Sequence, residues 1–393
     1  KYKGPCEIYY HDIGEYLSQE EKLKIIRGFS STKNIQWQRL QPNIEGDWIN
    51  QRNPEFENYL PMDSSDQNNK NIFLVKTSGV KSNRDAWVYN YNETFLTANI
   101  SCLISFYNDE VKRFIKANRP ADLDGFLCNE PKKISWTRGL KADVKRERIF
   151  KFEPHCLVDA TYRPYVKTYL YLNRSFNDAA GRNQDFFPTP KHENVVIGVT
   201  GMGSTKPFST LATNVIPDLE YISKSQCFPL YYYEKPEKGV IGDLVNSKIT
   251  PDKHGFIRRE AITDFALEIY QGTYGDEKIS KEDIFYYIYG LLHSPTYRSK
   301  YQNDLKKMLP RIPFVKDFWG FSKSGRQLAT WHLNYETIEP FDIKEEIKAG
   351  APKKAKDLYR VEEMVLPKVQ KEYDNTTIIY NRFVKLKGIP EDA

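Results

Sequence analysis

Short runs of β-branched and aromatic residues recur along the 393-residue chain, separated by clusters of turn-forming residues. Runs of this length and composition are typical of strands. We therefore predict strands at Ile72–Lys76, Trp87–Tyr91, Thr168–Leu172, Val195–Thr200, Phe228–Tyr233 and Thr377–Leu386, and a strand-like run at Pro5–Tyr10.

Helical segments are interspersed with these strands. Ser18 and Glu21 have the spacing of a capping box, which predicts a helix from about Gln19 to Arg27. Ser280 and Ser294 are suited to cap two further helices. The predicted helices after the first are Asp109–Ala117, Arg258–Gln271, Lys281–Leu292 and Pro295–Leu309. Because strands and helices do not alternate regularly, the fold class is predicted to be α+β, a β-rich domain with interspersed helices and a helical pair near 281–309.

The segment Asn43–Asn71 is polar and rich in Asn, Asp and Pro, which predicts a linker or an elaborated loop. The strand, loop and helix before it are typical of the end of an α/β domain. We therefore predict three parts: 1–42, the last elements of an α/β domain; 43–71, the linker or loop; and 72–393, the β-rich domain. Pro340–Lys356 is charged and is predicted to be a surface connection. The chain does not begin with Met and opens directly into a strand-like run, so it is interpreted as a piece of a longer polypeptide.

The composition argues against several classes of protein. The five cysteines are far apart with no CxxC pair, and the six histidines form no HExxH motif, so we expect neither a zinc site nor a disulfide framework. No run approaches the roughly 20 apolar residues of a membrane span, and no signal peptide is visible. We expect a cytoplasmic protein without a membrane partner.

Positive charge is concentrated in one block, although the net charge is only +6. The window Lys132–Arg182 contains 12 Lys or Arg against 5 acids, a difference of 12 − 5 = +7. Aromatic residues including Trp136, Tyr162 and Tyr165 are interleaved with these cations. Cations for phosphates and aromatics for bases suit a nucleic-acid partner. The alternative is a solvated basic face above an aromatic core.

Two loops carry further candidate contacts. Val75–Arg84 follows a predicted strand and collects Lys76, Ser78, Lys81, Ser82, Asn83 and Arg84, whose side chains could bind phosphate oxygens or base edges. Gly79 would permit a turn there; the alternative is an ordinary hairpin. Gly198–Lys206 is glycine-rich but matches neither a P-loop nor a dinucleotide fingerprint. Ser204, Thr205 and Lys206 could still contact DNA.

Two other patterns have simpler explanations. The helical pair around Ser294 resembles a helix-turn-helix, with cations on its second helix, but helical hairpins are common. Asp342, Glu346 and Lys348 echo the spacing of metal-dependent nucleases; we interpret this as coincidence, because the segment is expected to be helical or a loop. No nucleophile elbow, adenine-positioning motif or cofactor-binding glycine loop is present, so the chain is predicted to be non-catalytic by itself.

Ten sequence blocks, in one order, resemble the C-terminal specificity region of type ISP restriction–modification enzymes. These enzymes combine a nuclease, a helicase-like translocase, an adenine-N6 methyltransferase and a target recognition domain in one chain. The block TSGVKSNRDAWV (Thr77–Val88) resembles the opening of the recognition domain. The other blocks are Ile8–Leu17, Ile134–Lys141, Tyr162–Tyr165, Ser225–Leu230, Ile262–Asp264, Leu292–Pro295, Leu309–Pro313, Leu333–Glu336 and Thr377–Tyr380. Tyr165 matches loosely, since the family has Tyr or Phe there. The chain stops soon after Gly388, where a further helical tail is expected.

The resemblance implies that residues 1–42 end a methyltransferase domain and that the rest recognises duplex DNA. Partners would be double-stranded DNA and the upstream methyltransferase and helicase domains. No cofactor is expected in this piece, whereas the parent enzyme would use S-adenosylmethionine, ATP and magnesium. Alternatives are a structural coupler between methyltransferase and motor that does not contact DNA, and a nuclease. The predicted DNA-binding residues are Lys76, Ser78, Lys81, Asn83, Arg84, Arg138, Lys141, Lys145, Arg146, Arg148, Arg163, Lys167 and Lys206.

Overall fold

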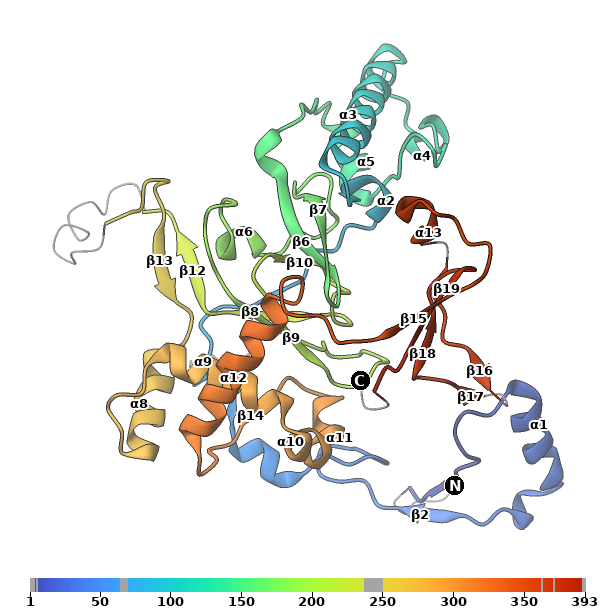
Figure 1. Cartoon of the computed structure of the whole chain (residues 1–393), viewed down its shortest axis with the longest axis vertical. Helices are drawn as coiled ribbons and strands as arrows, with labels where there is room; N and C mark the ends of the chain where they lie inside the picture. The colour runs from blue at the N-terminus through green and yellow to red at the C-terminus, as the bar shows by residue number, and fades with distance from the viewer. Residues whose placement is uncertain are drawn as a thin grey trace. The chain divides into compact units, whose positions relative to one another are not determined.

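The computed structural model describes residues 4, 6–63, 70–236, 250–361, 363–369 and 372–390. The chain forms two compact units, Lys1–Tyr335 and Glu336–Ala393 (Figure 1). Strands and helices are mixed in the larger unit without regular alternation, which confirms the predicted α+β class. Among the described residues, no helix combines the length and the apolar character that crossing a membrane requires.

A four-stranded antiparallel sheet lies at the centre of the larger unit. Its order is β4 (Thr77–Ser78), β11 (Gln226–Pro229), β8 (Val196–Val199) and β9 (Thr210–Thr213). Neighbouring residues point to opposite faces. Thus Val196 and Cys227 belong to one hydrophobic core, whereas Ile197 and Phe228 belong to another. A sheet buried on both faces explains why the predicted strand Val195–Thr200 has no polar face.

The first core lies between this sheet, a second sheet and a long helix. The second sheet has the order β10 (Ile216–Pro217), β6 (Leu157–Arg163), β7 (Val166–Tyr171), β5 (Tyr89–Asn90). Helix α3 (Glu93–Lys116) contacts β5, β7 and α5 (Arg138–Lys145). Its buried positions include Leu96, Ile100, Leu103 and Tyr107, a helical spacing. The helix is much longer than the predicted Asp109–Ala117, because this packing overrides the low helix propensity of its β-branched first half.

The second core is built on three helices, α8 (Asp264–Tyr274), α9 (Lys281–His293) and α12 (Phe318–Leu333). In Figure 1, α12 lies against α9 and beside β9, which it contacts. The predicted helix Lys281–Leu292 and its Ser280 cap are confirmed, with Asp283 completing a capping box. The sequence analysis missed α12, which contains two glycines that would weaken an isolated helix.

Some predicted elements are divided by the structure. Phe228–Tyr233 becomes β11 and β12 (Tyr231–Glu234), because the chain changes partner at Leu230. Pro295–Leu309 becomes α10 (Pro295–Lys300) and α11 (Gln302–Leu305), because Tyr301 turns inward to pack on Phe56 with ring centroids 4.9 Å apart. Trp87–Tyr91 becomes the short helix α2 (Asp85–Val88) followed by β5.

Two predictions had the wrong element type or position. Arg258–Gln271 begins as strand β13 (Ile257–Glu260), paired with β12, and becomes helical only after Thr263 caps α8. Cross-strand contacts such as the 2.8 Å ion pair between Arg259 and Glu234 favour the strand. Ile72–Lys76 is not a strand, since Ile72 and Phe73 are both buried and only Phe73 forms a bridge; the strand follows at β4.

The remaining elements of the larger unit are short. The predicted helix near the N-terminus is confirmed as α1 (Gln19–Gly28), with the Ser18–Glu21 capping box. Within the segment 43–71, Phe56 and Met62 are fully buried in the second core, so at least this part is packed. The other elements are β1 (Ile8–Tyr10), β2 (Gln38–Leu40), β3 (Leu60–Pro61), β14 (Arg311–Ile312), α4 (Leu123–Phe126), α6 (Asn183–Phe186) and 3-10 helices at Thr32–Asn34, Pro54–Asn58 and Pro154–Cys156.

The smaller unit is a sheet of order β15 (Lys344–Ile347), β19 (Val384–Lys387), β18 (Thr377–Ile379), with a hairpin of β16 (Lys368–Val369) and β17 (Glu372–Tyr373) and the helical turn α13 (Ala355–Leu358). The predicted strand Thr377–Leu386 is a hairpin, because the buried Asn381 side chain binds the backbone of the turn. Glu346 lies on β15, not in a helix or loop as expected, and forms an ion pair with Lys387.

The contact between α9 and α12 contains a histidine pair that should make the fold acid-sensitive. Burial, with help from Arg298 and His332, lowers the pKa of His293 from 6.5 to about 3. The unfolded chain therefore takes up a proton on His293 near pH 6.5 while the folded chain does not, so stability is full above that pH and is lost as the pH falls toward 3.

We expect the H293Q variant to lose less stability than the parent between about pH 6.5 and about pH 4.5, the difference being about 2 kcal/mol. Urea denaturation at both pH values measures this. H155Q, at an exposed histidine, is the control. Equal pH dependence of the parent and H293Q would contradict the prediction.

Candidate nucleic-acid interface

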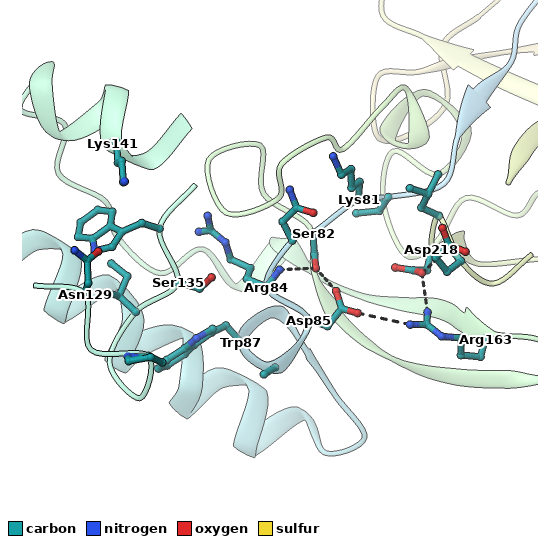
Figure 2. Close-up of a pocket in the computed structure, with 18 residues that line it drawn as sticks. Lys81, Ser82, Arg84, Asp85, Trp87, Asn129, Ser135, Lys141, Arg163 and Asp218 are labelled. Atoms are coloured by element: carbon teal, nitrogen blue, oxygen red, sulfur yellow. Dashed lines mark hydrogen bonds and ion pairs between the residues drawn. The ribbon is translucent and has the colours of Figure 1, made fainter. Parts of the chain in front are cut away.

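A cleft of about 830 Å³ lies on the larger unit beside the first core (Figure 2). It brings together the donor-rich loop and part of the basic block, which are far apart in the sequence. Lys81, Asn83 and Arg84 come from the loop, Lys141 from α5 and Arg163 from β6. The lining residues are Val80, Lys81, Ser82, Asn83, Arg84, Asp85, Ala86, Trp87, Asn129, Pro131, Ile134, Ser135, Trp136, Lys141, Arg163, Asp218, Leu219 and Glu220. The sequence analysis did not name Asn129, and it included Ser135 only within the block Ile134–Lys141.

The loop is held by backbone pairing on two sides and is not a hairpin. Val80 N donates to Pro217 O at 2.8 Å, and Leu219 N donates to Val80 O at 2.9 Å. On the other side, Lys81 and Ala179 exchange two backbone hydrogen bonds. Gly79 is needed for this close approach and not for a turn, because an added Cβ would lie 2.2 Å from Asp218 O.

The loop turns at Asn83, whose φ is positive at 54°, and not at Gly79 as expected. Asparagine tolerates this conformation better than most residues. The turn is closed by Ser82, whose hydroxyl donates to Asp85 and accepts from Arg84 N at 3.0 Å. These bonds present the Asn83 and Arg84 side chains to the cleft.

Arg84 is the unusual residue of the cleft. It is 4% exposed, and its Nε, Nη1 and Nη2 atoms have no hydrogen-bond partner among the described residues. Burial lowers the pKa of Arg84 to about 10, against the attraction of Asp178. Figure 2 shows its side chain extending from the loop toward the side of the cleft that carries Lys141.

Arg163 is held by an acidic network on the opposite side of the cleft. Its guanidinium pairs with Asp218 at 2.9 Å and with Asp85 at 3.7 Å, and lies 3.8 Å from the ring centroid of Tyr162. Tyr89 donates to Asp218 at 2.8 Å. Burial raises the pKa of Asp218. This network fixes the cleft wall but leaves the guanidinium of Arg163 little freedom.

Helix α5 adds a basic face at the end of the cleft that carries Lys141. Arg138, Lys141 and Lys145 are spaced i, i+3, i+7 and line a neighbouring hollow of about 560 Å³. Lys141 pairs with Asp124 at 2.6 Å. Arg138 and Lys145 are exposed and form no ion pair with any residue that the structure describes. These two cations are therefore available to a phosphate.

The other predicted residues line neither hollow. Arg146 and Arg148 both pair with the buried Asp143, at 3.6 and 3.1 Å. Lys76 pairs with Asp63 at 2.5 Å, and Ser78 lies in β4. Lys167 donates to Leu333 O at 3.3 Å, while Lys206 is exposed on the loop after β8. Several members of the basic block thus support the fold.

The cations of the helical pair are largely engaged within the protein. Arg298 donates to Leu292 O at 2.6 Å, Lys300 pairs with Glu55 at 2.7 Å and Lys307 pairs with Asp47 at 3.1 Å. Lys306 is exposed. The second half of the pair is also broken into two short helices, so it does not form a long recognition helix.

One group of side chains outside the cleft could offer metal ligands. The ligand atoms of Glu153, His155 and Cys156 all lie within 4.8 Å of one another. The Cys156 thiol donates to Glu153 at 3.6 Å, and burial raises the pKa of Cys156 to about 11. A thiol that resists deprotonation is a poor metal ligand.

Comparisons with known proteins agree on one family. The model of the Type ISP C-terminal specificity domain matches residues 71–393. A nuclease-deletion mutant of the Type ISP restriction–modification enzyme LlaGI, in complex with a DNA substrate mimic, is 34% identical with a TM-score of 0.78. The ATP-dependent Type ISP restriction–modification enzyme LlaBIII bound to DNA is 30% identical with a TM-score of 0.79, and the DrdV–DNA complex is 27% identical with a TM-score of 0.78.

The present chain is covered to 98% in each of these three alignments but spans only 27%, 23% and 36% of the respective chains. It therefore corresponds to about a quarter to a third of these larger proteins. No curated protein matches the chain.

Proposed function

Because this chain belongs to the Type ISP C-terminal specificity domain family, we propose that it recognises a specific sequence in duplex DNA through the cleft and the basic face of α5. The observation that carries the proposal is the convergence of the loop Val80–Trp87, Lys141 and Arg163 on one hollow. Lysine and arginine side chains would fix the register on phosphates, and polar loop side chains would read base edges. The DNA complexes of the similar proteins support the same partner.

The predicted lysines and arginines would contribute to this binding in three ways. Arg138 and Lys145, with no ion pair among the described residues, would bind phosphates directly, as would Lys206. Lys81 and Lys141 would exchange a surface carboxylate for a phosphate, at small cost because exposed ion pairs are weak. Arg146 and Arg148 would contribute less, since they neutralise the buried Asp143.

Replacing Arg138 and Lys145 together by glutamine should weaken binding to mixed-sequence duplex DNA about tenfold near 0.15 M salt and reduce the slope of log K against log salt by about 2. Each lost phosphate contact releases about one counterion fewer. Glutamine keeps the helix propensity of the replaced residues. Fluorescence anisotropy titrations at four salt concentrations measure both quantities.

The matched control is K278Q combined with K323Q. Lys278 lies just before α9 and Lys323 lies on α12; both are exposed and form no ion pair with a described residue. We expect this control to bind as the parent does. If R138Q/K145Q has the parent's affinity and slope, the proposed interface is wrong. If the parent itself gives no DNA crosslink, the alternative of a structural coupler is favoured.

In the longer protein, this domain would direct adenine-N6 methylation carried out by an upstream methyltransferase domain. That domain would extrude an adenine and use S-adenosylmethionine, while helicase and nuclease domains would use ATP and magnesium to translocate and cleave. The longer protein would be located in the cytoplasm, where it could reach duplex DNA. The similarity to Type ISP enzymes supports these extensions.

A further inference from the structure

Among the residues that the structure describes, none forms a hydrogen bond with the Arg84 guanidinium. The backbone N–H of Arg84 is bonded to Ser82, and the residue is 96% buried (100 − 4). Removing a charge from water without a partner destabilises a fold. A methionine would fill similar space without that cost. The buried guanidinium of Arg84 therefore destabilises the free protein. A ligand that accepted its hydrogen bonds would remove this cost.

The other cations of the cleft are already matched by acids. Lys81 pairs with Asp178, Lys141 with Asp124, and Arg163 with Asp218. Arg84 is the cation of the cleft that lacks such a partner among the described residues. An acceptor that enters the cleft would supply the missing hydrogen bonds.

The lining of the cleft favours a base edge over a phosphate. Three acids, Asp85, Asp218 and Glu220, offset three of its four cations, so the cleft itself offers a phosphate little net attraction. Neutral polar groups and flat rings also line it, including Asn129 and Trp87. A base is neutral, has a flat face and carries polar edge atoms. Among base edges, the paired acceptors O6 and N7 of guanine fit the two parallel N–H groups of a guanidinium.

We infer that Arg84 determines specificity by reading one guanine of the recognised sequence, with two hydrogen bonds from its guanidinium to O6 and N7. This inference rests on the proposed function. In the free protein the guanidinium lies buried beneath the surface of the cleft. Rotation about its side-chain torsions, which have several staggered minima, brings it to the base. The unpaired charge is thus retained because DNA, and not the protein, completes its hydrogen bonds.

The test begins with sequence selection from a randomised duplex library by the 393-residue chain and by its R84M variant. The parent should select a sequence with a guanine that R84M no longer prefers. Replacing that guanine by 7-deazaguanine, which lacks N7, should weaken binding by the parent at least about fivefold and leave R84M unaffected. The salt slope should be equal for both proteins, and the melting temperature of R84M should be no lower than the parent's.

The controls separate this inference from the proposed function. R84K keeps the charge but not the fork, so it should lose the guanine preference as R84M does. If the parent selects no sequence, the proposed function fails and this inference with it. If the parent selects a sequence that R84M selects equally well, or if no guanine is sensitive to 7-deaza substitution, this inference alone is overturned.

Two other outcomes would also overturn it. A salt slope that is smaller by about 1 in R84M, with affinity reduced equally for all sequences, would identify a phosphate contact. A lowered melting temperature in R84M would assign Arg84 a structural role. The 7-deazaguanine arm uses only the parent protein, so a parent insensitive to the substitution overturns the inference even if no variant folds.

Discussion

Replacing Gly325 with alanine is expected to lower the free energy of unfolding of the larger unit by about 3 kcal/mol. Helices α9 and α12 touch through their backbones at this point. A Cβ on Gly325 would lie 1.9 Å from Tyr286 O and 2.8 Å from Gly290 N. Neither obstacle is a flexible side chain, so the helices must separate and the second core must loosen. The unfolding midpoint in urea measures the loss.

The matched control is G272A in α8. Gly272 is also in a helix, but a Cβ there would meet nothing within 4 Å. Alanine is the better helix former, so G272A should be neutral or stabilising by up to about 1 kcal/mol. An equal effect of G325A and G272A would show that the two helices do not approach as closely as described.

The substitution G79A is expected to cost about 2 kcal/mol of stability and to reduce DNA binding more than stability alone explains. A Cβ would lie 2.2 Å from Asp218 O and 2.6 Å from Leu219 N, so the loop must leave the segment that positions it. Lys81, Asn83 and Arg84 would then move together. DNA titrations well below the melting temperature, combined with thermal denaturation, separate the two effects.

G139A provides the comparison for this second prediction. Gly139 lies on α5 near the same cleft, and the nearest atom to an added Cβ is Thr137 Oγ1 at 3.8 Å, an ordinary contact. We expect G139A to fold and bind DNA as the parent does. If G79A retains full DNA binding, the loop does not depend on its pairing with Pro217–Leu219.

Elements with strong local signals could be predicted from the sequence. Helices α1 and α9 have capping boxes, and their starts at Gln19 and Lys281 are confirmed. Strand β8 is a compact apolar run and was also found. In each case the sequence near the element is sufficient, because a cap or an uninterrupted apolar run needs no distant partner.

Elements whose signals depend on distant residues were missed or misassigned. Helix α12 contains Gly320 and Gly325, and the second of these is favourable only because α9 lies against it. Strand β13 was assigned to a helix, since its pairing with β12 bridges a long stretch of sequence. The early turns of α3 are rich in Thr and Ile, and only packing on the β5–β7 sheet makes them helical.

The family resemblance is confirmed by the matching family model, whereas the DNA-binding residues remain predictions. The loop motif predicted Lys81, Asn83 and Arg84 together, since they are neighbours in sequence. Asn129 could not be found, because a lone asparagine carries no signal until folding brings it to the cleft. Charge counting also could not separate Arg146 and Arg148, which neutralise a buried acid, from Arg138, which faces solvent.

The central sheet, with one core on each face, limits how recognition could be transferred between enzymes. Strand β4 leads directly into the cleft loop, and its neighbour β11 and the next strand, β8, contribute residues to both cores. A graft of the cleft without the helices of the second core would expose Ile197 and Phe228 to water. A chimaera with altered specificity would therefore have to exchange the whole larger unit, Lys1–Tyr335. The alternative is to exchange only individual side chains of the loop Val80–Trp87.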